Sequence, residues 1–165
     1  MDIRLFDLDR DFAIIKNWIT DERTNMLWCA NRIQYPMSKT IFKDFLKEIS
    51  DKYGDIPYVA VDDADKPAGF YAYSVNEATK EGMLKFVVVD PDKRGKGIAR
   101  EMLGRVVATA LADENVQAVQ LNVFSVNEPA RKCYQKIGFV ERNVTKEAVN
   151  FGDETWDRIN MLIKC

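Results

Sequence analysis

Short apolar runs of strand length alternate along this chain with longer stretches in which apolar residues recur every three or four positions. The short β-branched or alternating runs predict strands, and the periodic stretches predict amphipathic helices. The expected strands are residues 3–6, 57–62, 68–75, 82–89, 117–124, 139–144 and 154–163, and the expected helices are residues 9–20, 39–52, 98–111 and 128–137. Residues 21–37 are aromatic without a clear period, and we expect them to be irregular. The pattern predicts one mixed α/β domain over residues 1–165.

One strand leads directly into a basic turn that contains glycine, and a helix follows at once. The strand ends with Val87, Val88 and Val89, and the turn and helix start read RGKGIA over residues 94–99. A helix start directs free backbone N–H groups and partial positive charge at one point. Gly95 and Gly97 allow a ligand to come close to the backbone. Arg94, Lys96 and Arg100 add positive charge, so this junction predicts a phosphate or pyrophosphate site.

The turn differs from two common nucleotide-binding motifs. The sequence G-x-x-x-x-G-K-S/T is absent, and G-x-G-x-x-G fails because Arg100 stands at the third glycine position. A basic turn exposed to solvent without any ligand is the alternative interpretation.

A second segment, LNVFSVNEPARKCYQKIGF over residues 121–139, predicts a strand, a capped helix and the start of another strand. Asn127 has the character of an N-cap, and Gly138 suits the position after a helix end. Ala130 and Tyr134 share one helix face. Taken alone, Asn127 would serve as a cap and Tyr134 as a packing residue.

Together the two segments resemble the GNAT superfamily of acyl-CoA-dependent N-acetyltransferases. The family's coenzyme motif Q/R-x-x-G-x-G/A corresponds to residues 94–99, and its second motif corresponds to Asn127, Ala130, Tyr134, Gly138 and Phe139. The resemblance covers residues 56–163 well and the N-terminal third loosely. It implies an α/β (α+β) fold with a mixed, twisted central sheet, helices on both faces, and a splay between the two central strands in which coenzyme A lies.

The resemblance also implies roles for individual residues, with acetyl-CoA as co-substrate and no metal. Backbone groups of Val87, Val88 and Val89 would align the pantetheine arm, and the Val89 N–H would donate to the thioester carbonyl. Tyr134 would be the general acid for the leaving thiolate, and Asn127 would contact the pantetheine. The pyrophosphate would be held by Arg94, Gly95, Lys96, Gly97, Ile98, Ala99 and Arg100.

The general base and the acceptor are less constrained. The position at which related protein acetyltransferases carry a Glu is Asn122 here, and an amide is not a base. Glu22, Glu77 and Glu81 are alternative bases, although a solvated surface carboxylate is the simpler interpretation of each. Trp28, Arg32 and Tyr35 would lie on the acceptor side. Aromatic groups suit an amine there, but they equally suit plain helix packing.

Composition limits the function classes. The net charge of −2 argues against broad electrostatic binding of nucleic acid. Cys29, Cys133 and Cys165 are widely spaced and there is no His, so we expect reduced thiols, a cytoplasmic protein and no zinc site. No apolar run suits a signal or a membrane span. The sequence leaves open whether the protein forms a homodimer.

Three hypotheses follow. The first is an enzyme that transfers acetyl from acetyl-CoA to a primary amine of a small molecule by direct attack. The second is a protein N-terminal or lysine acetyltransferase. The third is a non-catalytic acyl-CoA-binding module, and the presence of both Asn127 and Tyr134 favours an enzyme over it.

Overall fold

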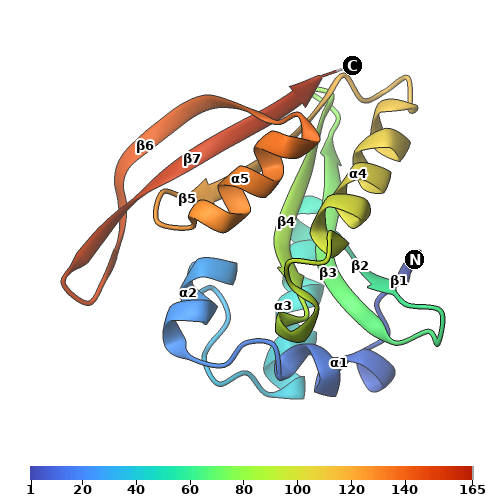
Figure 1. Cartoon of the computed structure of the whole chain (residues 1–165), viewed down its shortest axis with the longest axis vertical. Helices are drawn as coiled ribbons and strands as arrows, with labels where there is room; N and C mark the ends of the chain where they lie inside the picture. Colours follow the sequence, from blue (N-terminus) through green and yellow to red (C-terminus); the bar gives the residue numbers. More distant parts are fainter. Residues whose placement is uncertain (165) are drawn as a thin grey trace.

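The computed structural model describes residues 1–164, so Cys165 lies outside the described residues. The chain forms strands and helices in the order expected for an α/β domain (Figure 1). In chain order they are β1 Asp2–Leu5, α1 Leu8–Lys16, α2 Glu22–Cys29, α3 Lys39–Tyr53, β2 Ile56–Val61, β3 Pro67–Asn76, β4 Glu81–Val89, the 3-10 turn η1 Pro91–Lys93, α4 Ile98–Leu111, β5 Ala118–Phe124, α5 Glu128–Ile137, β6 Val140–Phe151 and β7 Glu154–Lys164.

A seven-stranded mixed sheet of order β1-β2-β3-β4-β5-β7-β6 forms the centre of the molecule. All neighbouring strands are antiparallel except β4 and β5, which are parallel. These two strands pair only over residues 81–83 and 118–120. Beyond that point β5 turns away from β4 and carries β7 and β6 with it (Figure 1). The predicted splay between the two central strands is therefore confirmed.

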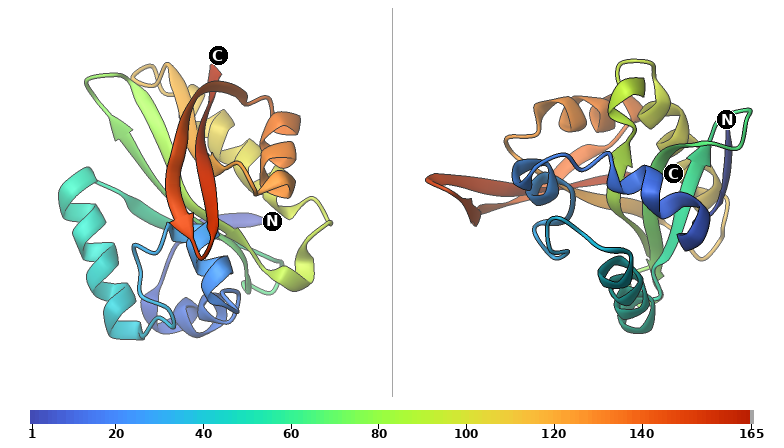
Figure 2. Two further views of the ribbon diagram at one scale, coloured as in Figure 1. Left: turned by 90° about the vertical axis from the view of Figure 1, so that its left-hand side faces the viewer. Right: turned by 90° about the horizontal axis from the view of Figure 1, so that it is seen from below.

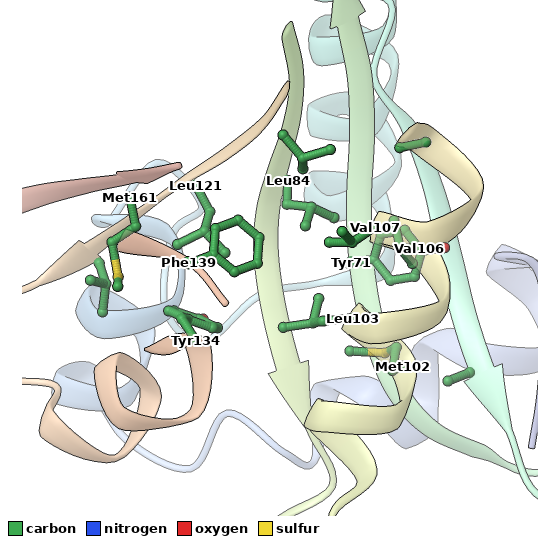
Figure 3. Close-up of a cluster of buried hydrophobic side chains, with 14 of the residues drawn as sticks. Tyr71, Leu84, Met102, Leu103, Val106, Val107, Leu121, Tyr134, Phe139 and Met161 are labelled. Carbon is green, nitrogen blue, oxygen red and sulfur yellow. The ribbon is translucent and has the colours of Figure 1, made fainter. Parts of the chain in front are cut away.

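Helices cover both faces of the sheet (Figure 2). One core joins α4 and α5 to the sheet, and Figure 3 shows Leu84, Leu103, Leu121 and Tyr134 within it. The other core joins α1, α2 and α3 to the opposite face, around Phe42 and Phe70. Since each strand alternates its side chains between the faces, a splay in the sheet opens a passage between the two cores.

Capping residues define several helix ends as the sequence predicts. The Ser38 hydroxyl accepts from the Ile41 N–H at 3.1 Å at the start of α3, and Asn127 caps α5. Gly138 ends α5 with a φ of 121°, where its N–H and that of Phe139 both donate to the Tyr134 carbonyl. These caps hold the second motif in place.

Three predicted elements are wrong in part. The segment 21–37 was expected to be irregular, but it contains α2, which begins at the N-cap Asp21 and buries Trp28 and Cys29. The first helix ends at Lys16 rather than at residue 20. The strand expected over residues 139–144 continues to Phe151, because β6 and β7 form a long hairpin with two register shifts. In each case tertiary packing, rather than local propensity, decides the boundary.

Candidate active site

A cleft of about 1000 Å³ passes through the splay between β4 and β5. It is lined by backbone and side chains of β4 from Met83 to Val89 and of β5 from Leu121 to Phe124. Helices α2, α4 and α5 and strand β7 complete the walls. Beyond residue 83 the edge of β4 that faces β5 is unpaired with any strand of the described chain. An extended ligand therefore has free backbone groups along which to lie.

A β-bulge interrupts β4 in the middle of the cleft. The register against β3 shifts between Phe70 and Ala72, and Phe86 has a φ of 54°. The Trp28 indole N–H of α2 donates to the Phe86 carbonyl at 2.8 Å. This hydrogen bond links α2 to the bulge. The bulge changes the direction of the backbone before Val87, Val88 and Val89, which line the cleft.

The turn between η1 and α4 closes one end of the cleft. Gly95 and Gly97 have φ values of 75° and 80°, which only glycine adopts without strain. Gly97 is the N-cap of α4 and provides no side-chain hydrogen bond to the first turn. The N–H groups at the start of α4 thus keep their capacity to bind an anion.

Basic side chains from η1, α4 and α5 surround this helix start. Lys93 pairs with Asp62 at 3.2 Å, whereas Arg94 and Arg100 have no ion pair with any of residues 1–164. Lys132 and Lys136 of α5 also line the cleft and are likewise without an ion pair in the described chain. These two lysines were not predicted as site residues, although their spacing of four residues places them on one face of α5. Together these residues create a positive end to the cleft.

Tyr134 lies on the inner wall of the cleft, in the last turn of α5. Its side chain is 8% exposed and packs edge-on against Phe139 at a centroid distance of 6.2 Å (Figure 3). Among residues 1–164 its hydroxyl has no hydrogen-bond partner. Burial, with a smaller contribution from Cys133, raises the pKa of the phenol above its ordinary value. A protonated, unpartnered O–H at a cleft wall is a proton donor available to a ligand.

Asn127 also lines the cleft, at the N-terminus of α5. Its side-chain oxygen accepts from the Ala130 N–H at 3.4 Å, so the residue is the helix cap that the sequence suggested. Because Asn127 lines the cleft, its contact with the pantetheine stays a prediction.

The structure brings most of the predicted site residues together, and it leaves several out. The cleft is lined by Trp28, Val87, Val88, Val89, Arg94, Gly95, Gly97, Ile98, Ala99, Arg100, Asn122, Asn127 and Tyr134. Lys96 is exposed on the same turn but is not part of the wall.

None of the acidic residues suggested as a base is among the described residues that line the cleft. Glu81 begins β4, at the end opposite Val89, where Arg142 binds it at 2.7 Å. Glu77 lies in the turn before that strand, and Glu22 is exposed at the start of α2. The Tyr35 hydroxyl donates to the Thr20 carbonyl at 2.9 Å, in a separate small pocket. These four residues are thus outside the lining of the cleft, and their roles as base or acceptor contact stay predictions.

Two further basic residues line the far side of the cleft, and of these only Arg32 lies in the segment expected to form the acceptor side. Arg158 of β7 lines the cleft because β7 pairs with β5. Arg32, which follows α2, lies over the Phe86 ring at 5.5 Å and the Phe45 ring at 5.3 Å. Both positions depend on contacts between segments distant in sequence.

Two further features concern membranes and metals. No helix within residues 1–164 is long and apolar enough to cross a membrane. In the same residues, no group of three His, Cys, Asp or Glu side chains is arranged to hold a metal ion.

The splayed sheet, the helix start and the buried phenol define a protein of the N-acetyltransferase class. The profile of the acetyltransferase (GNAT) family matches residues 14–139. The chain belongs to this family, which confirms the resemblance and the enzyme class inferred from the two motifs.

Individual relatives are distant. An uncharacterized N-acetyltransferase from Methanocaldococcus jannaschii is 31% identical over 86 residues, covering 49% of this chain and 38% of that protein. The SPbeta prophage-derived uncharacterized N-acetyltransferase YokL from Bacillus subtilis is 21% identical over 117 residues, covering 71% of this chain and 66% of that protein. The matched part of this chain thus spans less than two thirds of either relative's length.

The fold is similar to that of the spermidine N-acetyltransferase from Vibrio cholerae in complex with CoA and spermine. The TM-score is 0.81 at 20% sequence identity, over 99% of this chain and 94% of that one. At this identity the likeness establishes the fold.

Proposed function

We propose that this protein transfers the acetyl group of acetyl-CoA to a primary amine of a small molecule by direct attack. The observation that carries the proposal is the arrangement of one cleft: an uncapped helix start with unpaired basic side chains at one end, a free strand edge along it, and a protonated phenol on its wall. The Vibrio cholerae neighbour, a spermidine N-acetyltransferase, supports a small amine as acceptor.

In this proposal acetyl-CoA lies along the edge of β4. Its pyrophosphate binds the backbone N–H groups of residues 95–100, with Arg94 and Arg100 beside it. The pantetheine follows Val87, Val88 and Val89, and the Val89 N–H donates to the thioester oxygen. That bond strengthens as the oxygen becomes negative in the transition state.

The leaving group is the thiolate of CoA, and Tyr134 protonates it. The raised pKa of the phenol keeps it protonated at neutral pH, so the proton is present when the C–S bond breaks. The neutral amine forms the C–N bond as the C–S bond breaks, and the phenol proton moves to sulfur. The nitrogen, cationic after the attack, then loses one proton to solvent, and solvent returns a proton to the Tyr134 phenolate.

The attacking amine must be neutral, and the cleft favours this without a carboxylate base. Every charged residue of the described chain that lines the cleft is a lysine or an arginine. Nearby positive charge lowers the pKa of a bound ammonium group, so the amine loses its proton to solvent on binding. Asn122 holds the place at which a carboxylate base would stand in related protein acetyltransferases, which favours a small-molecule acceptor.

The experiment is calorimetric titration of acetyl-CoA followed by an assay of free-thiol release with a panel of amines and N-terminal peptides. We expect binding of acetyl-CoA and thiol release with small amines. Binding without any thiol release would leave the non-catalytic module as the function, and release with peptides alone would favour the protein acetyltransferase.

A further inference from the structure

The side of the cleft opposite the α4 turn is formed by α2, β5 and β7, and we call it the α2 side. On β5, alternation places Gln120, Asn122 and Phe124 on one face, and Phe124 packs with Met26 of α2 and Trp156 of β7. Helix α2 therefore lies against this part of the sheet, near the β6–β7 hairpin (Figure 2). With acetyl-CoA along β4 as proposed above, an acceptor would approach the thioester from this side, because α4 and α5 occupy the other face.

Arg158 belongs to the α2 side. It lies directly opposite Phe124 in the antiparallel pairing of β5 with β7, so both side chains share that face. Arg158 is exposed and has no ion pair within residues 1–164, and it lines the cleft. Lys85, by contrast, is neutralised by the buried Asp55 carboxylate at 2.8 Å.

The direction in which the Asn122 amide points follows from a chain of hydrogen bonds. Arg142 can only donate, so the oxygen of Asn160 accepts from its Nε at 2.7 Å. The Asn160 amide nitrogen must then donate, and it does so to the Asn122 oxygen at 2.9 Å and to the Gln120 oxygen at 2.9 Å. The Asn122 oxygen is thereby occupied, and its N–H₂ group remains available to the cleft.

The network itself is well anchored. Asn160 is 8% exposed, and Arg142 also binds both oxygens of Glu81 and the Gln120 oxygen at 3.1 Å. A network in which each amide oxygen already accepts from a fixed donor resists inversion of any one amide, since each reversal would face two donors together. The Asn122 amide therefore presents its N–H₂ donors to the cleft. Asn122 pairs with Asn160, which lies two residues from Arg158 along β7, so Asn122 and Arg158 lie on the same face.

We propose that the acceptor of this enzyme is a primary amine that also carries a carboxylate, bound by the Arg158 guanidinium and the Asn122 N–H₂ group. This deepens the proposed function and rests on it. Arginine binds carboxylates in a planar, charge-assisted arrangement, and the amide adds a second donor. Arg32, over the rings of Phe45 and Phe86, contributes further positive potential at the mouth.

The same surface disfavours a polyamine. A polycation such as spermidine would meet arginine and amide donors on the α2 side, and like charges cost binding free energy. The acceptor chemistry of this cleft thus differs from that named for the Vibrio cholerae neighbour, although the folds agree.

The test compares matched amines in the free-thiol assay with saturating acetyl-CoA. The panel is the proteinogenic amino acids and short ω-amino acids, each beside its own carboxamide, with spermidine as the polycation. We expect kcat/KM to be about 10- to 100-fold higher for the best acid than for its carboxamide, as a hydrogen-bonded charge pair provides. The difference should appear mainly in KM.

Two variants localise the effect. Arg158→Gln should remove most of the preference for the acid, measured as the ratio of kcat/KM for the acid to kcat/KM for its carboxamide. Asn122→Asp replaces the donor by a carboxylate of the same shape and should reduce acid turnover while improving that of spermidine. Arg10→Gln, which alters an exposed arginine of α1 remote from the cleft, is the matched control and should behave as the wild type.

Each outcome of this test supports or contradicts the carboxylate-bearing acceptor, the acetyltransferase function, or both. Thiol release that is equal for acids and carboxamides, or best with spermidine, would overturn the carboxylate acceptor and leave the acetyltransferase in place. Failure of acetyl-CoA to bind would overturn both. If acetyl-CoA binds but no amine reacts, the panel is titrated into the CoA complex by calorimetry. Binding of acids that Arg158→Gln loses supports the proposal, and binding without that preference contradicts it.

Discussion

The two sides of the cleft are built in different ways. The α4 side is made from short contiguous segments: the end of β4, the glycine turn and the start of α4, together with the second motif on α5. The α2 side takes residues from α2, β5 and β7, whose neighbours in space are far apart in the chain. The α4 side could be predicted from consecutive residues, whereas the residues of the α2 side come together only when the sheet forms.

This difference separates what is common to the family from what is particular to this chain. A phosphate group is bound by backbone N–H groups and a helix start, which any sequence with the right turn can supply. An acceptor is bound by side chains, and their identity varies freely on a fixed scaffold. We therefore expect substitutions on the α4 side to abolish coenzyme binding, and those on the α2 side to alter acceptor choice.

The largest effect is expected for Gly97→Asp. The change places a carboxylate at the uncapped start of α4, where it repels the pyrophosphate, and it imposes a side chain on a φ of 80°. Affinity for acetyl-CoA, measured by calorimetry, should fall at least about 100-fold. Gly54→Asp is the matched control, since Gly54 has a φ of 72°, equally open space and no contact with the cleft. A folded Gly97→Asp protein with unchanged affinity would reject the pyrophosphate site.

Tyr134→Phe tests the chemistry between the two sides. The change keeps the ring against Phe139 and removes only the hydroxyl, so acetyl-CoA affinity and the melting temperature should stay near wild type. We expect kcat to fall about 100-fold, the lower end for a positioned acid. Stopped-time thiol assays beside thermal melts provide the measurement. Full turnover in a protein that melts normally would mean that water or substrate protonates the thiolate.

Trp28→Phe tests the bond that links α2 to the β4 bulge. The variant loses the indole donor to the Phe86 carbonyl, and the free energy of unfolding should fall by about 1–3 kcal/mol from the lost hydrogen bond and lost volume. Trp18→Phe is the comparison, because Trp18 is also buried but makes no side-chain hydrogen bond within residues 1–164. Urea titrations should show the larger loss at Trp28, together with a lower kcat/KM. Equal losses of unfolding free energy in the two variants would show that the indole hydrogen bond makes no measurable contribution to stability.

The pH dependence of turnover offers a smaller, directional test. Burial raises the pKa of the Tyr134 phenol, so the acid loses its proton at a higher pH than the reference value of about 10. We expect kcat to show no decline on the alkaline side up to about pH 10. A decline well below that pH which is absent from Tyr134→Phe would contradict a protonated phenol in a desolvated site.

Removal of metal should have the smallest effect. The reaction proposed uses backbone N–H groups, a phenol and solvent, so dialysis against a chelator should leave kcat/KM unchanged. Loss of activity that an added divalent ion restores would show that a metal participates.

The motifs could be predicted from sequence because their chemistry is local. The turn at residues 94–99 has positive φ values at its two glycines, which its composition already implied. Asn127 caps the helix it was expected to cap, because a capping oxygen reaches only two or three residues along the chain. Met102, Val106 and Ala110 recur every four residues in the predicted helix 98–111 and are buried in α4, as helical periodicity requires.

What only the tertiary structure decided is the placement of groups whose partners are distant. Glu81 looked like a base, but register pairs it with Arg142 at the far end of β4. Helix α2 has few local signals and is stable because Trp28 and Met26 are buried against the sheet. From sequence, Asn122 was noted only as a missing carboxylate. Its proposed role as a donor depends on hydrogen bonds from Arg142 to Asn160 and from Asn160 to Asn122, across two strand pairings. Strand register is set by the whole sheet, so no window of sequence contains it.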